Sequence, residues 1–214
     1  ALLVSVNRDG SDGTSHAISG EYVELGSAAH VSLRFEDPYL AGVHARIERV
    51  GDGAAKITSL DRLNGVFRRL RSDTLLTDGS VILLGRELLR FELLSPEEGK
   101  PTPLMQHGVS LFGSPLREAW GRIVQVLPSG GARDIRHLYG DEVVVGREEG
   151  DVVFGDDEFL SRRHAAFRWQ LGHCVLADLG SSNGTFLRLT EPLTLGDGDF
   201  LRIGDQMFRF KPQW

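Results

Sequence analysis

Three short islands in the second half of the chain combine the residue types that bind a phosphate group. They are Gly146-Arg147, Ser161-Arg162-Arg163-His164, and the run Asp-Leu-Gly-Ser-Ser-Asn-Gly-Thr at 178–185. A phosphate dianion is held best by a cation with fork geometry, by hydroxyl donors and by free backbone N–H groups. Arg147 supplies the cation, Ser161 and Ser182 supply hydroxyls, and the loop rich in Ser, Asn and Gly supplies backbone donors. The islands therefore predict an anion site built from loops.

The segments between these islands have the pattern of short β-strands. Residues 143–145 form an apolar run, and residues 165–169 alternate between core and solvent. Asp197-Gly198 is a turn signal between apolar segments, and residues 207–210 read as a closing strand. Many short strands with turns between them indicate an all-β sandwich.

The same pattern occurs twice along the chain. Leu40 to Ala45 aligns with Leu160 to Ala165 at an offset of 120, and Asn64-Gly65 aligns with Asn183-Gly184 at an offset of 119. A period of about 120 residues indicates a duplicated domain, because the units of a solenoid are only about 20–50 residues long.

Together the islands resemble the forkhead-associated (FHA) domain, a β-sandwich family that binds peptides carrying phosphothreonine. The resemblance implies ten or eleven strands in each copy. We therefore expect two tandem antiparallel β-sandwiches, a first domain at 1–95 and a second at 118–214. A partly packed linker at 96–117 would join them, with its apolar half at 109–116 lying against one of the domains.

The resemblance also assigns roles to the residues of the second copy. The expected contacts to phosphothreonine are Arg147, Ser161, Arg162, Arg163, Ser182 and Asn183, and the expected supports of the site are Gly146, His164, Gly184 and Thr185. His164 would brace the loops rather than touch the ligand. A Ser–His–Asp triad is rejected because the chain has no nucleophile elbow and no evident oxyanion loop. No catalytic residue and no enzymatic activity are expected.

The first copy lacks several of these side chains. Ser27 stands at the position of Arg147, Ala41 at that of Ser161, and Gly42-Val43 at that of Arg162-Arg163. Loss of the cation and the hydroxyl predicts no useful phosphothreonine binding, because a desolvated phosphate needs compensating charge. A cation from elsewhere, Arg34, Arg46 or Arg62, remains open as a substitute.

The composition narrows the class of protein. The chain has 214 residues, a net charge of −6 and a pI near 5.6, which argues against general attraction to nucleic acid or to anionic membranes. The one cysteine, Cys174, excludes an internal disulfide and a Cys-rich zinc site, and no cofactor or metal is expected. No apolar run is long enough to span a membrane, so a cytoplasmic location is expected. Scarce Lys among the 24 basic residues hints at a bacterial genome.

The loops around the site carry many acidic residues. We expect them to favour peptides with basic or neutral flanks, and they are Glu148, Glu149, Asp151, Asp156, Asp157 and Glu158. In the FHA family, loop side chains read the third residue after the phosphothreonine, and Glu158, Phe159 and the loop after Phe186 are the matching positions here.

The function expected from the sequence is an adaptor or regulatory module in Ser/Thr kinase signalling. Its second domain would bind a Thr-phosphorylated protein or peptide, with a Ser/Thr protein kinase or its substrate as the partner, while the first domain serves as a scaffold without phosphate. The alternative is a phospho-independent docking scaffold or an oligomerisation module.

Overall fold

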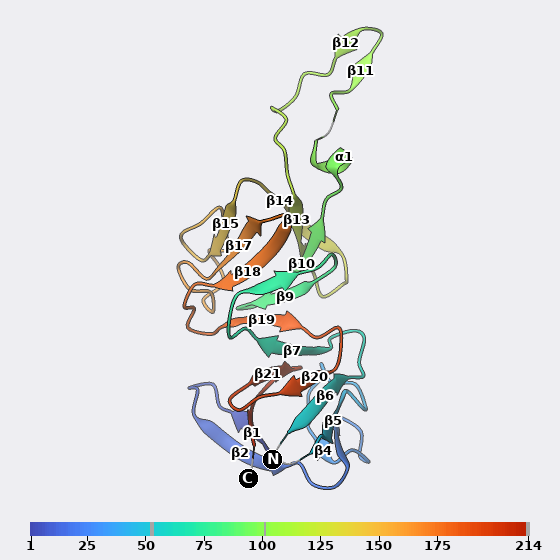
Figure 1. The fold of residues 1–214 in the computed structure, drawn as a ribbon, viewed down its shortest axis with the longest axis vertical. Coiled ribbons are helices and arrows are strands. Elements are labelled where there is room, and N and C mark those ends of the chain that lie inside the picture. The colour runs from blue at the N-terminus through green and yellow to red at the C-terminus, as the bar shows by residue number, and fades with distance from the viewer. Residues whose placement is uncertain (52–53, 101, 213–214) are drawn as a thin grey trace. The chain divides into compact units, whose positions relative to one another are not determined.

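The fold was examined in a computed structural model, which describes residues 1–51, 54–100 and 102–212. Almost all regular secondary structure in the described residues is β-strand, and each sequence copy contributes ten strands there, β1–β10 and β13–β22 (Figure 1). This number and the mostly antiparallel pairing confirm the predicted class of tandem FHA-like sandwiches. Among these residues, no helix is long and apolar enough to cross a membrane.

The chain forms two compact units, and neither is continuous with one sequence copy. The first unit comprises 1–69 and 186–214, and the second comprises 70–185. The continuous domains expected at 1–95 and 118–214 therefore describe the repeats in the sequence, whereas the compact units exchange strands between those repeats.

The first unit has two sheets. One contains β19-β7-β21-β22-β1-β2 and the other contains β20-β6-β5-β3-β4, in these spatial orders. Its strands from the first copy are β1 (Leu2–Val6), β2 (Asp12–Ala17), β3 (Tyr22–Gly26), β4 (Leu33–Arg34), β5 (Ala45–Arg49), β6 (Ala55–Ser59) and β7 (Val66–Arg69). Those from the second copy are β19 (Thr185–Arg188), whose first residue is the last of the other unit, β20 (Leu193–Leu195), β21 (Phe200–Ile203) and β22 (Gln206–Lys211).

The second unit repeats this plan. One sheet contains β9-β10-β13-β14 and the other contains β16-β15-β17-β18-β8. Its strands from the first copy are β8 (Thr74–Leu76), β9 (Val81–Leu84) and β10 (Glu87–Leu93). Those from the second copy are β13 (Gly121–Val126), β14 (Ala132–Leu138), β15 (Glu142–Gly146), β16 (Val152–Val153), β17 (Ala165–Gln170) and β18 (His173–Asp178).

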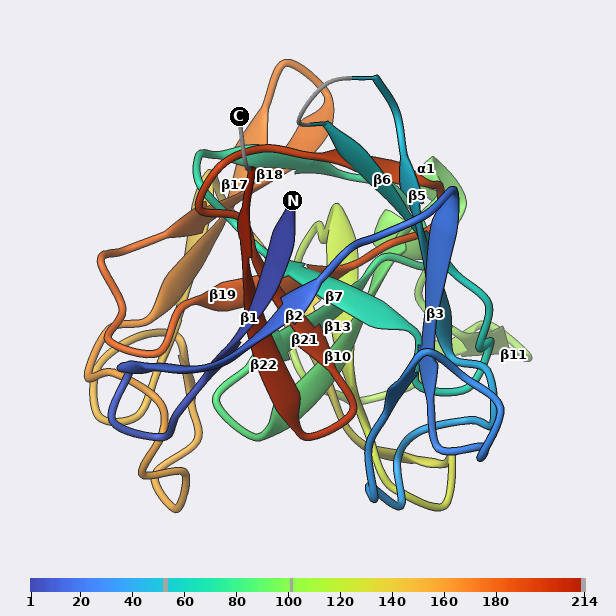
Figure 2. The ribbon, with the colours of Figure 1, turned by 90° about the horizontal axis from the view of Figure 1, so that it is seen from below.

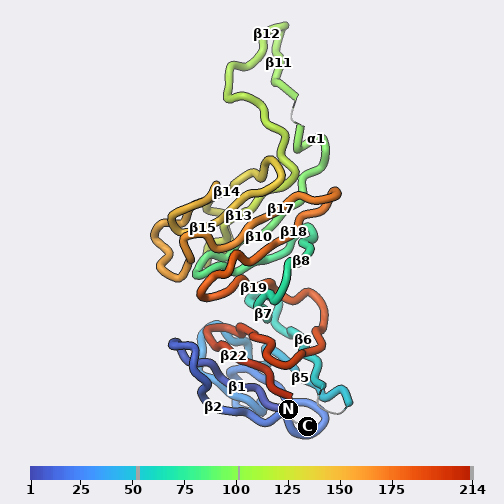
Figure 3. The backbone as a smooth tube through the Cα atoms, turned by 60° about the vertical axis from the view of Figure 1, so that its left-hand side comes forward, coloured from blue at the N-terminus to red at the C-terminus, as the bar shows by residue number. Residues whose placement is uncertain are grey.

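Strand pairing shows the exchange directly. The N-terminal strand β1 lies between β2 and the C-terminal strand β22, so blue and red strands are neighbours in Figure 2. In the other unit, β10 pairs with β13 and β8 pairs with β18, which brings green strands beside yellow and orange ones (Figure 3). The exchange is possible because the last three strands of the two repeats have similar lengths and the same spacing and apolar pattern.

Both cores contain side chains from both repeats. In the first unit, Phe208 and Phe210 from the second copy are buried in one cluster with Leu25 and Ile47 from the first. In the second unit, Phe91 from the first copy stacks on Phe167 with 6.5 Å between the ring centroids. Each such side chain contributes about 1.5–3 kcal/mol when buried, so each unit depends on the strands it receives.

Charge pairing between strands fits the exchanged arrangement. Glu92 lies opposite Arg122 and accepts a hydrogen bond of 2.6 Å from it, and this bond lowers the pKa of Glu92. Lys211, the repeat equivalent of Glu92, instead pairs with Asp12 at 2.6 Å. If each copy kept its own last strand in the same register, Lys211 would face Arg122, and like charges on opposite strand positions are destabilising.

The linker is packed at its ends and not where we expected. The short helix α1 (Pro96–Gly99) has a capping box on Ser95, and Gly99 is buried against Ala119. Residues 109–116, predicted to pack, are exposed, and Phe112 is fully so. The hairpin of β11 (Met105–Gln106) and β12 (Val109–Ser110) satisfies its backbone within itself, and no other described strand pairs with it. Pro101 of this linker lies outside the described residues.

Candidate functional site

The site of the second unit begins where two loops are joined through their backbones. The N–H of Arg147 donates to the carbonyl of Ser161 at 2.9 Å, and the N–H of Glu149 donates to that of Arg162 at 3.0 Å. Gly146 ends β15 at this crossing, where a Cβ atom would collide with the carbonyl oxygen of Arg162. Glycine is required here because the two loop segments approach each other closely, and this crossing sets Arg147 at the rim of the site.

His164 ties the loop before β17 to the turn before β19. The imidazole is fully buried, and its Nδ1 accepts from the N–H of Ser161 at 3.2 Å. An accepting nitrogen is unprotonated, so Nε2 carries the hydrogen and donates to the carbonyl of Gly184 at 3.1 Å. This geometry places His164 behind the site, in the bracing position that the sequence predicted.

The turn at 178–185 is organised by a carboxylate. Asp178 accepts hydrogen bonds from the backbone N–H groups of Gly180 and Ser181, each at 2.9 Å. It also accepts from the hydroxyls of Ser181 and Thr185, each at 2.6 Å. Burial alone would raise the pKa of Asp178, but these bonds outweigh it and lower the pKa. Gly184 has a φ of 85°, which lets the chain turn sharply into β19.

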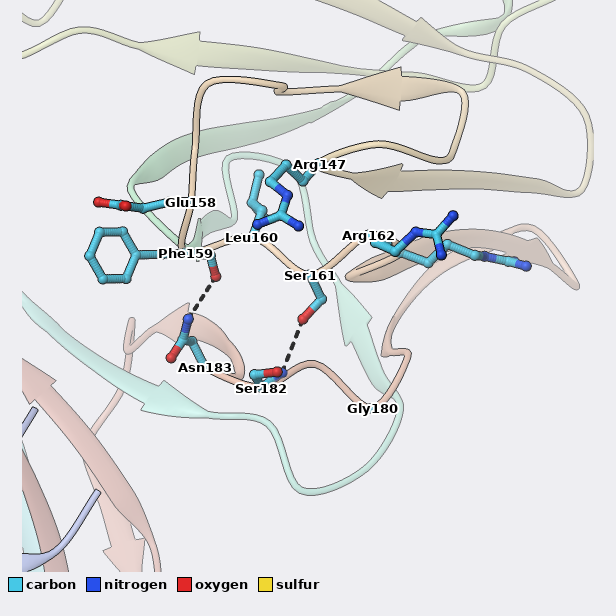
Figure 4. Close-up of a pocket in the computed structure, with 10 residues that line it drawn as sticks. Arg147, Glu158, Phe159, Leu160, Ser161, Arg162, Gly180, Ser182 and Asn183 are labelled. Carbon is cyan, nitrogen blue, oxygen red and sulfur yellow. Dashed lines mark hydrogen bonds between the residues drawn. The ribbon is translucent and has the colours of Figure 1, made fainter. Parts of the chain in front are cut away.

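All six predicted contact residues line one pocket of about 460 Å³. Its lining consists of Arg147, Glu158, Phe159, Leu160, Ser161, Arg162, Arg163, Gly180, Ser182 and Asn183. Figure 4 shows Ser161 near the middle, with Arg162 toward one end and Phe159 with Glu158 at the other. The N–H of Ser182 donates to the hydroxyl of Ser161 at 3.1 Å, and the amide of Asn183 donates to the carbonyl of Phe159 at 2.8 Å. These bonds hold the two loops side by side.

Two of the cations that line the pocket, Arg147 and Arg162, are paired with neighbouring carboxylates. Arg147 donates from Nε and Nη2 to one oxygen of Glu148, at 3.1 and 2.7 Å. Arg162 lies 3.2 Å from the other oxygen of Glu148 and 2.5 Å from Glu149. These groups are at least one-third exposed, and exposed ion pairs are worth only about 0–1 kcal/mol, so an incoming dianion can replace a carboxylate here.

The first unit keeps the same backbone crossing with other side chains. The N–H of Ser27 donates to the carbonyl of Ala41 at 3.0 Å, and a Cβ on Gly26 would collide with the carbonyl of Gly42. His44 bonds to the N–H of Ala41 and the carbonyl of Gly65, as His164 does in its own unit. Leu63, at the position of Ser182, is 82 % exposed.

Two of the arginines considered as substitute cations, Arg34 and Arg46, lie in different surroundings. Arg34 donates to the carbonyl of Ser27 at 3.3 Å, so it lies beside the position that Arg147 occupies in the other unit. Arg46 is paired with Glu24 at 2.8 Å. Arg34 is therefore the better placed of these two to act as a substitute cation.

Comparison with known proteins identifies the family. A family model described as FHA domain matches residues 23–85 and again residues 143–204. The chain belongs to the FHA-domain family. The two matched segments fall on the two sequence copies, as the repeat predicts.

Two bacterial relatives match a single FHA-sized segment. One is an oxoglutarate dehydrogenase inhibitor of Corynebacterium diphtheriae, 39 % identical over 85 residues, which are 38 % of this chain and 57 % of the relative. The other is the glycogen accumulation regulator GarA of Mycolicibacterium smegmatis, 36 % identical over 85 residues, which are 38 % of this chain and 52 % of that protein. The chain thus spans little more than half the length of these relatives.

Among solved structures, one described as a structural and functional analysis of phosphothreonine-dependent FHA domain interactions is similar. It is 29 % identical, with a TM-score of 0.26, and the match covers 42 % of this chain and 94 % of that one.

Sequence reasoning missed the structural use of several acidic residues around the FHA site. Asp157 is 3 % exposed, and one oxygen of its carboxylate accepts from the N–H of Phe159 at 2.9 Å. Asp151 accepts from the N–H of Val144. The expected preference for peptides with basic or neutral flanks assumed that these carboxylates are free to contact the peptide. Most of them have partners within the unit. The sequence did contain one sign of a structural role for Asp157, because the first copy has an Asp, Asp37, at the equivalent position.

Proposed function

We propose that the FHA site in the 70–185 unit binds phosphothreonine peptides. The observation that supports this most strongly is the convergence of Arg147, Ser161, Arg162, Arg163, Ser182 and Asn183 on one pocket, from two loops that His164 and the Ser182–Ser161 hydrogen bond join to each other. In this proposal Arg147 grips the phosphate, with Ser161, Ser182 and backbone N–H groups as further donors. Asn183 holds the peptide backbone next to the phosphothreonine.

The proposed biological role is an adaptor or regulatory module in Ser/Thr kinase signalling. Its partner would be a Thr-phosphorylated protein, either a Ser/Thr kinase or the substrate of one. The two relatives above carry the names of an inhibitor and a regulator, which supports a regulatory rather than a catalytic role. The first-copy site would be a scaffold that does not bind phosphate, because Ser27 and Ala41 replace the cation and the hydroxyl.

A degenerate phosphothreonine peptide library tests the proposal. The wild-type chain should bind phosphothreonine peptides, and neither unphosphorylated nor phosphoserine peptides should bind comparably. Arg147→Ala should remove that binding, while Arg34→Ala, which removes the candidate substitute cation of the first unit, should leave it intact. Binding that survives Arg147→Ala would move the site elsewhere, and loss through Arg34→Ala would move it to the first unit. Binding independent of phosphate would favour the docking-scaffold alternative.

A further inference from the structure

The turn between β9 and β10 belongs to the first sequence copy but packs on the site loop of the second. One oxygen of Asp157 accepts from the N–H of Arg86 at 2.6 Å, while its other oxygen accepts from the N–H of Phe159. Gly85 has a φ of 56°, and a Cβ there would lie 2.5 Å from the Asp157 carboxylate. A single buried carboxylate therefore fixes the incoming turn to the loop that carries Phe159 and Ser161.

The side chain of Arg86 lies against two residues that line the pocket. Its guanidinium carbon is 4.5 Å from the centroid of the Phe159 ring, which is a cation–π distance. Its Nη2 lies 3.3 Å from a carboxylate oxygen of Glu158. Phe159 and Glu158 form the end of the pocket away from Arg162 (Figure 4). Arg86 thus adds a positive charge at that end.

Because the strands are exchanged, the residue at this position of the pocket is a positively charged Arg86 and not a negatively charged Asp205. In the first unit the equivalent turn is Gly204-Asp205, and the N–H of Asp205 donates to Asp37 at 2.8 Å, as Arg86 does to Asp157. If the second copy used its own turn, Asp205 would stand where Arg86 stands. A carboxylate would then face Glu158, and like charges would meet at the wall of the pocket.

We propose that Arg86 is a specificity-determining residue of the phosphopeptide site, favouring peptides with an acidic residue, Asp or Glu, near the phosphothreonine, in place of the basic or neutral flanks expected from the sequence. The inference rests on the proposed function. Stacking on Phe159 and the fixed N–H hold Arg86 in place. The Arg86–Glu158 pair is weak, because its side chains are 65 % and 72 % exposed. A guanidinium has five N–H donors, so Arg86 can bind a peptide carboxylate beside Glu158.

The experiment measures binding of the full chain to phosphothreonine peptides randomised at each flanking position. Wild type should favour Asp and Glu over Lys and Arg at one position by about two- to fivefold, as befits an exposed charge pair. Arg86→Ala should remove this preference and Arg86→Glu should invert it. Asp205→Arg is the matched control, since Asp205 lies on the turn of the other unit, and it should leave the preference unchanged.

The outcomes separate this inference from the proposed function. Phosphate-dependent binding with an unaltered flanking preference in both Arg86 variants would overturn the role of Arg86 alone. A preference that changes in Asp205→Arg but not in Arg86→Glu would overturn it too, because the second copy would then be using its own turn. A wild-type chain that binds no phosphothreonine peptide would overturn both proposals.

Discussion

The two units present the same loop skeleton with different chemistry on it. In both, a glycine at the end of a strand allows two loops to cross, and a buried histidine joins the second loop to a Gly carbonyl. In both, an asparagine amide donates to the equivalent backbone carbonyl. Asn64 donates to that of Tyr39 at 2.9 Å, and Asn183 donates to that of Phe159 at 2.8 Å.

The positions that differ are those that would face a phosphate. Arg147, Ser161 and Ser182 have Ser27, Ala41 and Leu63 as their counterparts. The bracing residues that both units share support the backbone whether or not a ligand binds. The comparison teaches that the skeleton is a property of buried hydrogen bonds, whereas the proposed phosphate binding would depend on a few exposed side chains placed on it.

The largest effect should come from giving the second site the residues of the first. The double substitution Arg147→Ser with Ser161→Ala removes a cation and a hydroxyl, and we expect a loss of about 3–6 kcal/mol in binding free energy, or two to four decades in affinity. Calorimetric titration with a phosphothreonine peptide from the library measures this.

The control for this substitution is thermal unfolding. The first unit has the same backbone crossing with Ser27 and Ala41, so the melting temperature should change little. An affinity within tenfold of wild type would show that these two side chains do not separate the sites.

A disulfide can test which strands complete which unit. Leu76 on β8 lies directly opposite Cys174 on β18, so Leu76→Cys should form a cross-link with it and add about 2–4 kcal/mol of stability. Burial raises the pKa of Cys174 to about 12, so the oxidation should be done during refolding. Leu195→Cys is the control, because Leu195 faces Ala55 in the other unit. Peptide mapping that finds the link with position 195 instead would contradict the exchange.

The paired histidines should separate stability from binding. His44→Ala and His164→Ala each leave a part-buried N–H and a buried carbonyl without the histidine as partner, which costs about 2–3 kcal/mol in unfolding free energy. Denaturant titration should show similar losses in both variants. Peptide affinity should fall in His164→Ala and not in His44→Ala. Equal effects on affinity would mean that the two loop clusters are coupled.

The sequence was sufficient for the fold class and for six of the residues that line the pocket. Repetition of the islands identified two sandwiches, and their resemblance to the FHA domain assigned six contact side chains, which line one pocket. These inferences succeed because they depend on local pattern, such as the Ser-Ser-Asn-Gly turn after a strand and the arginine after a glycine.

The sequence was not sufficient for the origin of the completing strands or for the charge at the pocket wall. Strands β8–β10 and β20–β22 have equivalent patterns, so the core alone does not decide between them. The signal that could have decided was electrostatic, since Glu92 complements Arg122 and Lys211 does not. Arg86 was missed for the same reason, because its place depends on the exchange.

The turns of the two units should also be compared at low pH. Burial acts to raise the pKa of Asp178 and of Asp61, but hydrogen bonds from each turn lower both below the ordinary value of 3.8. A depressed pKa gives stability that is present above the ordinary value and is lost as pH falls through the folded value. Stability should therefore decline below about pH 4. Asp178→Asn should cost about 1–2 kcal/mol at neutral pH and flatten part of the decline. An unchanged acid profile would contradict the role of this carboxylate.

The smallest effect should come from the carboxylate that holds the site arginine. Glu148 accepts two hydrogen bonds from Arg147 and also approaches Arg162, so it competes with a phosphate for the same donors. The first unit has Ala28 at this position, after Ser27 rather than after an arginine. Glu148→Gln should therefore tighten phosphopeptide binding by about two- to fivefold, the worth of an exposed pair. The gain should shrink at high salt, which screens the carboxylate. Weaker binding in Glu148→Gln would instead mean that Glu148 orients Arg147 for the phosphate. Its absence from the first unit would then contribute to the predicted lack of phosphate binding there.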